Sequence, residues 1–456
     1  MKTAIIFIFV TILLAGNISA QPMKDNSEGY NQLMNRTQWF RDARFGMFIH
    51  FGAYALPGRG EWVKSNEHLT TEQYQKYVDA FYPSAYNAKE WARIAKKAGM
   101  KYAVLTAKHH DGFCMFDSKL TDYKVSKRFD GRDVVREFLD AFRAEGIKVG
   151  LYYSLIDWNH ADYPNVGNHP QRDDKEYAKR KFNWDNYLKY MHGQVEELAK
   201  NYGKIDIMWF DYSFDDYSGE KWKAKELVAM LRKYQPEIIL DNRLEVNHGV
   251  SLNGRQISQY GDIETPEQAI PDKGIVHVSG KPMPWETCLT LNNNWGYTEN
   301  DHEWKSPALI VQSLVNCVSK SGNLLLNVGP DATGRIPEKS IEILVEVGKW
   351  MDLNAESIYG CGSSSVEKPE CGRITQKGKT IYVHWISPII GPINLPGLAD
   401  KVKNVTLLSS GVELPTSSTW WGNGSQGNFF ININSPIHFT FDHSNTSDIV
   451  IKIELK

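Results

Sequence analysis

Apolar runs and amphipathic stretches alternate along the chain from about Arg44 to Met351. Eight of the apolar runs have the length and composition of β-strands, and the stretches between them repeat apolar residues at the spacing of a helix. This alternation favours parallel strands joined by crossover helices. The sequence therefore predicts an α/β fold, a (β/α)8-like barrel of the TIM type.

Helix boundaries support this pattern. Asp133 can cap a helix that Gly146 closes, and Ser306 followed by Pro307 combines a capping residue with a proline in the first turn. The helical stretches expected on these grounds are 91–98, 134–145, 184–202, 221–235, the stretch that starts at 306, and 337–351.

Polar residues stand where several of the predicted strands end. The run Phe45–His50 ends in one histidine, Tyr102–His110 ends in two, and Ile205–Asp211 ends in a carboxylate. A parallel α/β barrel carries its chemistry at the C-terminal ends of its strands. The chain is therefore interpreted as a barrel enzyme with its polar groups on one rim.

The pattern changes after about Tyr359. Short β-rich runs, separated by Gly, Pro, Ser and Asn, replace the alternation of strands and helices. Within 449–455, Ile451 and Ile453 alternate with Lys452 and Glu454, as in a half-buried strand. We expect a catalytic domain over 21–359 and a C-terminal β-sandwich over 360–456. The sandwich is expected to pack against the barrel, with carbohydrate binding as the alternative role.

Composition narrows the class of protein. The 456 residues are 42% hydrophobic and 23% charged, with a net charge of −2 and dispersed Lys and Arg, as in a soluble globular protein of two domains. Nothing indicates a nucleic-acid surface. The chain has 14 Trp, and aromatic faces suit the C–H faces of sugars, although most buried Trp only fill cores.

The first twenty residues have the pattern of a signal peptide. Lys2 precedes the apolar run Ile5–Leu14, and Ile18–Ala20 offers a small-residue cleavage site. We therefore expect an exported protein, periplasmic or secreted, with no membrane span after the signal is removed. Five cysteines are too few for a disulfide scaffold, although Cys361 and Cys371 could pair.

Asp211 is the leading candidate for a nucleophile, because it closes an apolar strand on the predicted rim. Asp206 lies earlier in the same run and is less well placed. Glycoside hydrolysis needs a second carboxylate that acts as acid and then as base. The segment Gln259–Glu267 offers Asp262, Glu264 and Glu267, and the sequence alone does not choose among them.

The histidines raise the alternative of a metal site. His109 and His110 are adjacent, and adjacent side chains in a strand point to opposite faces, so they form a poor chelate unless the strand has ended. Together with His50 they suit hydrogen bonds to hydroxyl groups better. No nucleotide-binding motif is present. We expect neither a metal nor a cofactor.

With these residues identified, the chain resembles the retaining α-L-fucosidases of glycoside hydrolase family 29. The resemblance covers the barrel nearly end to end. It rests on eight stretches: Arg44–Gly52, Gly60–Trp62, Ala107–Phe113, Tyr152–Ser154, Met208–Asp211, Trp285–Cys288, Asn294–Tyr297 and Leu325–Pro330. It implies a barrel with a C-terminal β-sandwich, in agreement with the pattern above, and an exo-acting enzyme that releases terminal L-fucose by double displacement.

The resemblance also implies roles for single residues. Asp211 matches the nucleophile, and the Thr-Pro-Glu segment favours Glu267 as acid/base, with Glu264 in reserve. Trp295 matches an aromatic wall near the methyl group of the sugar. The remaining residues expected to line the fucose site are His50, Glu61, Trp62, His109, His110, Tyr153 and Arg243.

The expected partner is a fucosylated oligosaccharide or glycoconjugate. The continuous segment Trp285–Tyr297 is similar to that of fucosidases with broad linkage specificity. Two other functions stay open at this point. One is a related glycosidase that acts on another sugar, such as an α-galactoside, and the other is a fucose-binding protein without catalytic activity.

Overall fold

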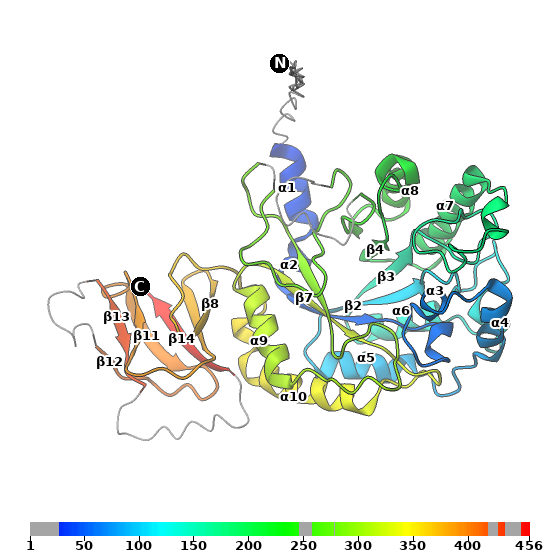
Figure 1. Ribbon diagram of the computed structural model, residues 1–456. Helices are drawn as coiled ribbons and strands as arrows, with labels where there is room; N and C mark the ends of the chain where they lie inside the picture. The colour runs from blue at the N-terminus through cyan, green and yellow to red at the C-terminus, as the bar shows by residue number, and fades with distance from the viewer. Residues whose placement is uncertain (1–26, 246–257, 278, 418–426, 434–447) are drawn as a thin grey trace, which may run out of the picture.

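A computed structural model describes residues 27–245, 258–277, 279–417, 427–433 and 448–456. Over these residues the chain forms a curled parallel sheet surrounded by helices, with antiparallel sheets beside it at the C-terminal end (Figure 1). This confirms the predicted fold class. The expected signal peptide, 1–20, lies outside the described residues.

The described part of the barrel has seven strands, one fewer than the eight apolar runs predicted. They follow the order β5-β4-β3-β2-β1-β7-β6, and every neighbouring pair is parallel. Their bounds are β1 (Phe45–Ile49), β2 (Tyr102–Lys108), β3 (Lys148–Ser154), β4 (Ile207–Asp211), β5 (Ile239–Leu240), β6 (Glu286–Thr290) and β7 (Asn323–Val328).

An irregular segment occupies the gap between β5 and β6, where an eighth strand would complete the barrel. Residues 263–267 lie between β5 and β6 and are joined to them by isolated parallel bridges. The bridges pair Asp241 with Ile263, Glu264 with Trp285, and Glu267 with Cys288. The sequence analysis identified these residues only as an acidic stretch, because a segment that makes single bridges lacks the regular alternation of a strand.

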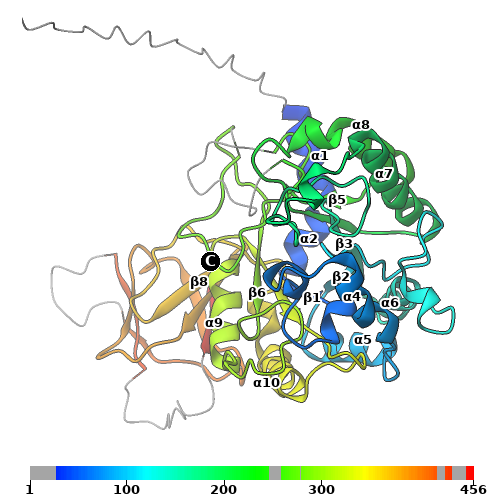
Figure 2. The same ribbon diagram turned by 45° about the vertical axis from the view of Figure 1, so that its right-hand side comes forward.

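Two helices, α6 and α9, begin at the capping residues that the sequence predicts, whereas α5 begins three residues before its predicted stretch and α8 three residues after. The Asp133 side chain accepts a hydrogen bond from the Arg136 N–H (2.8 Å), and the Ser306 hydroxyl accepts one from the Leu309 N–H (3.2 Å). The described helices are α1 (Ser27–Arg36), α2 (Gln38–Ala43), α3 (Val63–Asn66), α4 (Thr71–Ala80), α5 (Ala88–Lys97), α6 (Val134–Ala144), α7 (Trp184–Asn201), α8 (Ala224–Tyr234), α9 (Pro307–Val318) and α10 (Glu338–Asn354). Figure 2 shows α5, α9 and α10 together along one side of the barrel.

Large side chains fill the barrel below the catalytic end. Phe48, Tyr152 and Trp209 pack on one another with ring centroids 5.1–6.0 Å apart, and all three are buried. Beneath them the buried Glu286 accepts hydrogen bonds from the Tyr102 hydroxyl (2.6 Å) and the Trp209 indole N–H (3.0 Å). Burial raises the pKa of Glu286 to about 7. The barrel interior is thus a packed core.

Two antiparallel sheets follow the barrel, as predicted for the C-terminal sandwich. One has the order β11-β14-β9-β8 and the other β10-β13-β12, and a separate apolar core includes Ile381, Ile431 and Ile453. The strands are β8 (Gly372–Lys377), β9 (Thr380–Trp385), β10 (Ile393–Leu395), β11 (Val402–Leu407), β12 (Thr416–Ser417), β13 (Phe429–Ile431) and β14 (Ile449–Leu455).

The β-domain packs beside α9 and α10 (Figure 1). The Trp350 indole N–H donates to the Asp448 carbonyl (3.0 Å), and the Arg44 guanidinium donates to the Cys361 carbonyl (2.7 Å). Each of the five cysteines is buried and free, so the structure leaves Cys361 and Cys371 unpaired. Among the described helices, none has both the length and the apolar character that crossing a bilayer requires.

Candidate active site

The ends of β1 to β4 bring the predicted polar residues together. The parallel ladder pairs Ser154 at the end of β3 with Asp211 at the end of β4. His110 follows β2, and its Nε2 lies 3.7 Å from Asp211 Oδ2. The rim predicted from the sequence is therefore a real cluster, centred on the Asp211 carboxylate.

Both oxygens of Asp211 accept a hydrogen bond. Arg243 donates to Oδ1 (2.8 Å), and the Tyr152 hydroxyl donates to Oδ2 (2.8 Å). Burial alone would raise the pKa of Asp211, but the charge of Arg243, together with the hydrogen bonds from Tyr152 and Arg243, outweighs burial and holds the pKa below its ordinary value. Asp211 is thus kept as a carboxylate, with 16% of its side chain exposed.

Arg243 joins Asp211 to Glu267. The same nitrogen, Nη1, lies 2.8 Å from Asp211 Oδ1 and 2.8 Å from Glu267 Oε2. The two carboxylate oxygens can therefore be no farther apart than twice that distance. Burial opposes the charge on Arg243, but the two carboxylates more than compensate and raise its pKa. The result is one buried cation held between two acids.

Glu264, the reserve candidate, lies in a different environment. Its Oε2 accepts a hydrogen bond from the Asn242 amide (2.5 Å), and its burial raises its pKa to about 7. Asn242 in turn accepts from the Thr265 hydroxyl (2.9 Å), which accepts from Arg243 Nε (3.1 Å). A pKa near 7 would suit a general acid, but geometry comes before pKa, and Glu264 reaches Arg243 only through two other side chains. Glu267 is the better placed acid.

The two adjacent histidines both lie in the cluster, because β2 ends at Lys108. The rings of His109 and His110 have centroids 4.1 Å apart, and the His109 ring stacks on Tyr152 at 5.4 Å. Burial lowers the pKa of His110 to about 4 and that of His109 well below its ordinary value. Both rings are therefore neutral at neutral pH.

His50 and Trp295 form another wall of the cluster. Their rings have centroids 5.1 Å apart, and the His50 ring also lies 5.7 Å from His109. His50 Nδ1 lies 2.7 Å from Asn327 Oδ1, and burial lowers the pKa of His50 to about 3. Trp295 thus presents an aromatic surface beside a neutral histidine.

Glu61 and Trp62 complete the predicted set. Glu61 is buried, and its Oε2 accepts a hydrogen bond from the Gly296 N–H (2.8 Å), which connects it to the Trp295 loop. Burial raises the pKa of Glu61. The Trp62 ring meets His110 edge to face at 5.1 Å. Both residues therefore border the histidine cluster.

Among the residues predicted to bind the substrate, Tyr153 is the one that the structure does not bring to the cluster. Its hydroxyl donates to Gln194 Oε1 (2.8 Å), and its ring lies under the Lys108 ammonium at 4.4 Å. Side chains alternate along β3, so Tyr153 faces the helices while Tyr152 and Ser154 face Asp211. The alternation and the position of Asp211 on the neighbouring strand could have identified Tyr152 from the sequence.

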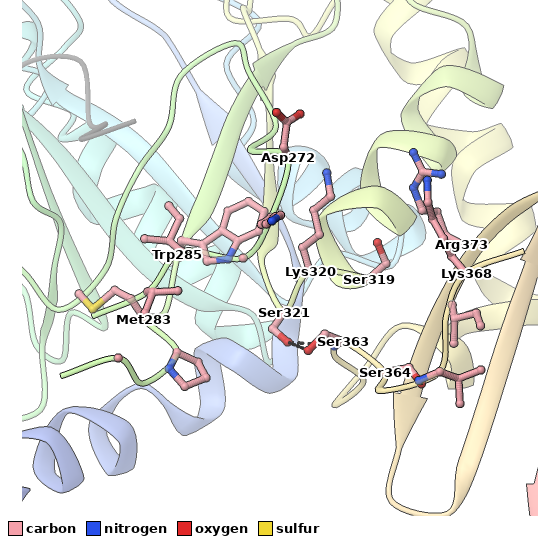
Figure 3. A pocket seen from close by; sticks show the side chains of 18 residues that line it. Asp272, Met283, Trp285, Ser319, Lys320, Ser321, Ser363, Ser364, Lys368 and Arg373 are labelled. Carbon is pink, nitrogen blue, oxygen red and sulfur yellow. Dashed lines mark hydrogen bonds between the residues drawn. The ribbon is translucent and has the colours of Figure 1, made fainter. Parts of the chain in front are cut away.

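A separate cavity lies at the opposite end of the strands. It has a volume of about 560 Å³ and opens between the barrel and the β-domain, and Trp285 and Ser321, just before β6 and β7, line it (Figure 3). Two of its cations are held by the protein itself, since Lys320 donates to the Pro271 carbonyl (2.6 Å) and Arg373 to Asn316 Oδ1 (3.2 Å). The cavity lacks the carboxylate pair, so it is not the candidate active site.

Within the described ranges, no three His, Cys, Asp or Glu side chains are arranged to hold a metal ion. The cluster instead combines two carboxylates, one arginine and several neutral imidazole, phenol and indole groups. This set matches acid/base and nucleophilic catalysis on a sugar.

Comparison with known proteins gives a consistent result. The family model described as alpha-L-fucosidase matches residues 12–356. Tissue alpha-L-fucosidase of Bos taurus is 30% identical over 426 residues, which cover 85% of this chain and 83% of the bovine protein. Alpha-L-fucosidase of Dictyostelium discoideum is 29% identical over 78% of each chain.

Solved structures are similar over nearly the whole chain. Alpha-L-fucosidase isoenzyme 1 from Paenibacillus thiaminolyticus is 50% identical, with a TM-score of 0.87, and the match covers 93% of this chain and all of the other. A family 29 alpha-L-fucosidase from Bacteroides thetaiotaomicron, solved as a trapped covalent intermediate with 2-fluoro-fucosyl fluoride, is 28% identical. Its TM-score is 0.78, and the match covers 92% of this chain and 96% of that one.

Proposed function

Because the chain belongs to the α-L-fucosidases of glycoside hydrolase family 29, we propose that it is an exported, exo-acting enzyme that releases terminal L-fucose with retention of configuration. Asp211 is the nucleophile and Glu267 the acid/base. The observation that carries this assignment is the bond of one Arg243 nitrogen to both carboxylates, at 2.8 Å each. A retaining pair is separated by about 5–5.5 Å, which this shared contact allows.

In the first step an oxygen of Asp211 attacks the anomeric carbon. The bond from that carbon to the glycosidic oxygen breaks, and the departing oxygen takes a proton from Glu267. The products are a fucosyl ester of Asp211 and the free aglycone. Tyr152 and Arg243 each bond one Asp211 oxygen, so the carboxylate meets the sugar in a fixed orientation.

In the second step the Glu267 carboxylate takes a proton from water. The water oxygen attacks the anomeric carbon, and the ester bond to Asp211 breaks. Glu267 has 27% of its side chain exposed, against 16% for Asp211, which suits the group that meets water. Two inversions at the same carbon return the configuration of the substrate.

The covalent intermediate trapped in the Bacteroides relative supports the double displacement. In that protein the intermediate formed from a 2-fluoro-fucosyl fluoride. Proton NMR of the first minutes of hydrolysis tests the same point in this chain. We expect α-fucose as the first anomer, before mutarotation, and initial β-fucose would overturn the retaining assignment.

Sugar selection depends on the wall that Trp295 forms beside His50. Trp295 offers an apolar ring next to His50, and an apolar wall favours the methyl group of fucose over a hydroxymethyl group by about 1–3 kcal/mol. Aryl α-L-fucoside should therefore be hydrolysed faster than aryl α-galactoside. Equal rates would favour the galactosidase alternative, and no hydrolysis of either would favour a binding protein.

The natural substrate is proposed to be a fucosylated oligosaccharide or glycoconjugate in several linkages. The basis is the continuous segment Trp285–Tyr297, which contributes β6 and the Trp295 wall. A panel of fucosylated oligosaccharides, assayed by released fucose, would test it. Cleavage of α1,3 and α1,4 linkages alone would contradict the broad specificity.

Export is proposed from the pattern of residues 1–20, an N-terminal lysine, an apolar run and a small-residue cleavage site. Expression of the full chain, followed by N-terminal sequencing of the protein from the medium or periplasm, tests it. We expect a mature protein that begins near Gln21. An uncleaved protein in the cytoplasm would contradict the proposal.

A further inference from the structure

Two histidines of the active site are held in the same way, through a side chain that is itself held by a backbone carbonyl. His110 is held by Ser154, and His50 is held by Asn327. A backbone carbonyl oxygen can only accept a hydrogen bond. It therefore fixes the direction of every hydrogen bond in the short chain that leads from it to the imidazole ring.

For His110 the chain starts at the carbonyl of Ile156. The Ser154 hydroxyl lies 2.7 Å from this carbonyl oxygen and 2.7 Å from His110 Nδ1. The hydroxyl has one proton, and the carbonyl requires it. Ser154 must then accept from His110, so the ring carries its proton on Nδ1. Its Nε2, which lies 3.7 Å from Asp211 Oδ2, is left with a lone pair.

For His50 the chain starts at the carbonyl of Trp295. The Asn327 amide nitrogen donates to this carbonyl at 2.7 Å, which fixes the orientation of the amide. The amide oxygen, Oδ1, must then face His50 Nδ1, at 2.7 Å, and it can only accept. His50 therefore also carries its proton on Nδ1 and presents an unprotonated Nε2.

We infer that Ser154 and Asn327 are positioning residues that hold His110 and His50 as neutral Nδ1–H tautomers, so that each Nε2 accepts a hydrogen bond from a sugar hydroxyl. In each ring the hydrogen-bond partner of Nδ1 fixes the protonation state of Nε2, which is the usual way in which proteins select a histidine tautomer. The inference rests on the proposed fucose site, but the tautomers themselves can be measured without a substrate.

The surroundings support neutral rings. Both rings are buried, and burial disfavours the charged imidazolium. The charged groups that act on His110 are Asp211, which favours a proton, and Lys108 and Arg243, which oppose one. On His50, Asp211 also favours the proton, and Arg243 opposes it. Burial has the largest effect on the pKa of both imidazole rings.

The consequence is a specificity rule for the substrate. At two positions the site requires a group that donates a hydrogen bond, which a hydroxyl can do and a methyl ether or a fluorine cannot. An imidazolium at either position would instead donate a hydrogen bond to the sugar. The site would then bind the methyl ether or fluorine analogue more readily. The two histidines therefore select for free hydroxyls on the terminal sugar.

The test is the protonation state of each ring in the full-length protein with 15N-labelled histidine. Long-range 15N–1H spectra at neutral pH, assigned with His50→Gln and His110→Gln, should give a protonated Nδ1 and an unprotonated Nε2 for both rings. An Nε2–H tautomer or an imidazolium at either ring would overturn the inference. These wild-type spectra decide the matter even if a further variant fails to fold.

Variants of the two positioning residues add a second readout. In Ser154→Ala the His110 signals should move toward a mixture of tautomers while those of His50 stay in place, and Asn327→Ala should do the reverse, so each ring is the control for the other. We expect kcat/KM for an aryl fucoside to fall by up to about 10-fold in each, the scale of one lost neutral hydrogen bond.

The matched control is Ser357→Ala. Ser357 is also fully buried and its hydroxyl also donates to a backbone carbonyl, that of Asn354, at 2.7 Å, but it lies away from the cluster. It should leave both tautomers and kcat/KM unchanged. Unaltered His110 and His50 spectra in the two test variants would overturn the positioning role, whatever the effect on activity.

Discussion

The catalytic end of the barrel consists of two parts that are held in different ways. On one part, here called the ladder side, β1 to β4 pair in continuous parallel ladders and carry His50, His109, His110 and Asp211. On the other part, here called the bridged segment (263–267), single bridges join the chain beside β5 and β6, and this segment carries Glu264 and Glu267.

This difference in how the two parts are held matches the different requirements of a nucleophile and an acid/base. The nucleophile, which we propose to be Asp211, must meet one carbon atom in one direction, and this carboxylate is fixed by the ladder, by Tyr152 and by Arg243. The acid/base, which we propose to be Glu267, must meet a leaving group in one step and water in the next, and this side chain is held by one arginine and remains more exposed.

The largest expected effect is on the ladder side, at the nucleophile. Asp211→Ala should lower kcat for an aryl fucoside by about 10⁴-fold or more, as removal of a nucleophile does in other enzymes. Added azide should restore turnover, because it can occupy the space of the lost carboxylate and attack the anomeric carbon. Near-normal activity without azide would remove Asp211 from the mechanism.

The next effect tests the bridged segment. Glu267→Ala should slow substrates with poor leaving groups by about 10²- to 10⁴-fold and activated aryl fucosides far less, because only the former need a proton on the departing oxygen. Glu264→Ala is the matched variant, three residues away. If Glu264→Ala shows this dependence on the leaving group and Glu267→Ala does not, the acid/base assignment is wrong.

A smaller effect compares two neighbours on β3. Tyr152→Phe removes a hydrogen bond to the Asp211 carboxylate and should lower kcat/KM by about 10- to 100-fold, the scale of one bond to a charged group. Tyr153→Phe removes only the bond to Gln194, so it should cost about 1 kcal/mol of stability and leave kcat/KM unchanged. The reverse order of activities would contradict the orientation of β3.

The smallest effect concerns stability at the bridged segment. Burial raises the pKa of Glu264 to about 7, so the folded state favours the protonated form. This contribution to stability is complete below the ordinary pKa of a glutamate and is lost as the pH rises through about 7. Glu264→Gln should therefore gain about 1–3 kcal/mol relative to the wild type between pH 4.5 and pH 8. Parallel curves of unfolding free energy against pH would contradict it.

The sequence predicts secondary structure correctly where apolar side chains recur with the regular period of a helix or a strand. The helix starts at Asp133 and Ser306 and the parallel strands were predicted because capping residues and apolar runs report local structure. The described residues contain seven strands of the eight expected, because the segment between β5 and β6 makes only single bridges. The conformation of such a segment is set by contacts with the two neighbouring strands, and a local sequence pattern does not reveal those contacts.

The site residues were likewise predictable where they lie at the ends of regular strands and not where they depend on tertiary contacts. Asp211 and the histidines were identified because they end apolar strands. The resemblance favours Tyr153, but side chains alternate along β3, and the register of β3 with β4 places Tyr152 on the same face as Asp211. Ser154 and Asn327 gave no signal of their own, since their importance comes from carbonyls that only the fold brings near.

The pairing of β1 with β7 has a consequence for how the enzyme regains activity after denaturation. The ladder joins Phe45 to Leu324, so barrel closure brings together residues very far apart in the chain, and contacts of this kind form slowly. His50 follows β1, and its partner Asn327 lies on β7. During refolding, helical circular dichroism can therefore recover well before fucosidase activity, and the delay between the two signals times the closure of the barrel.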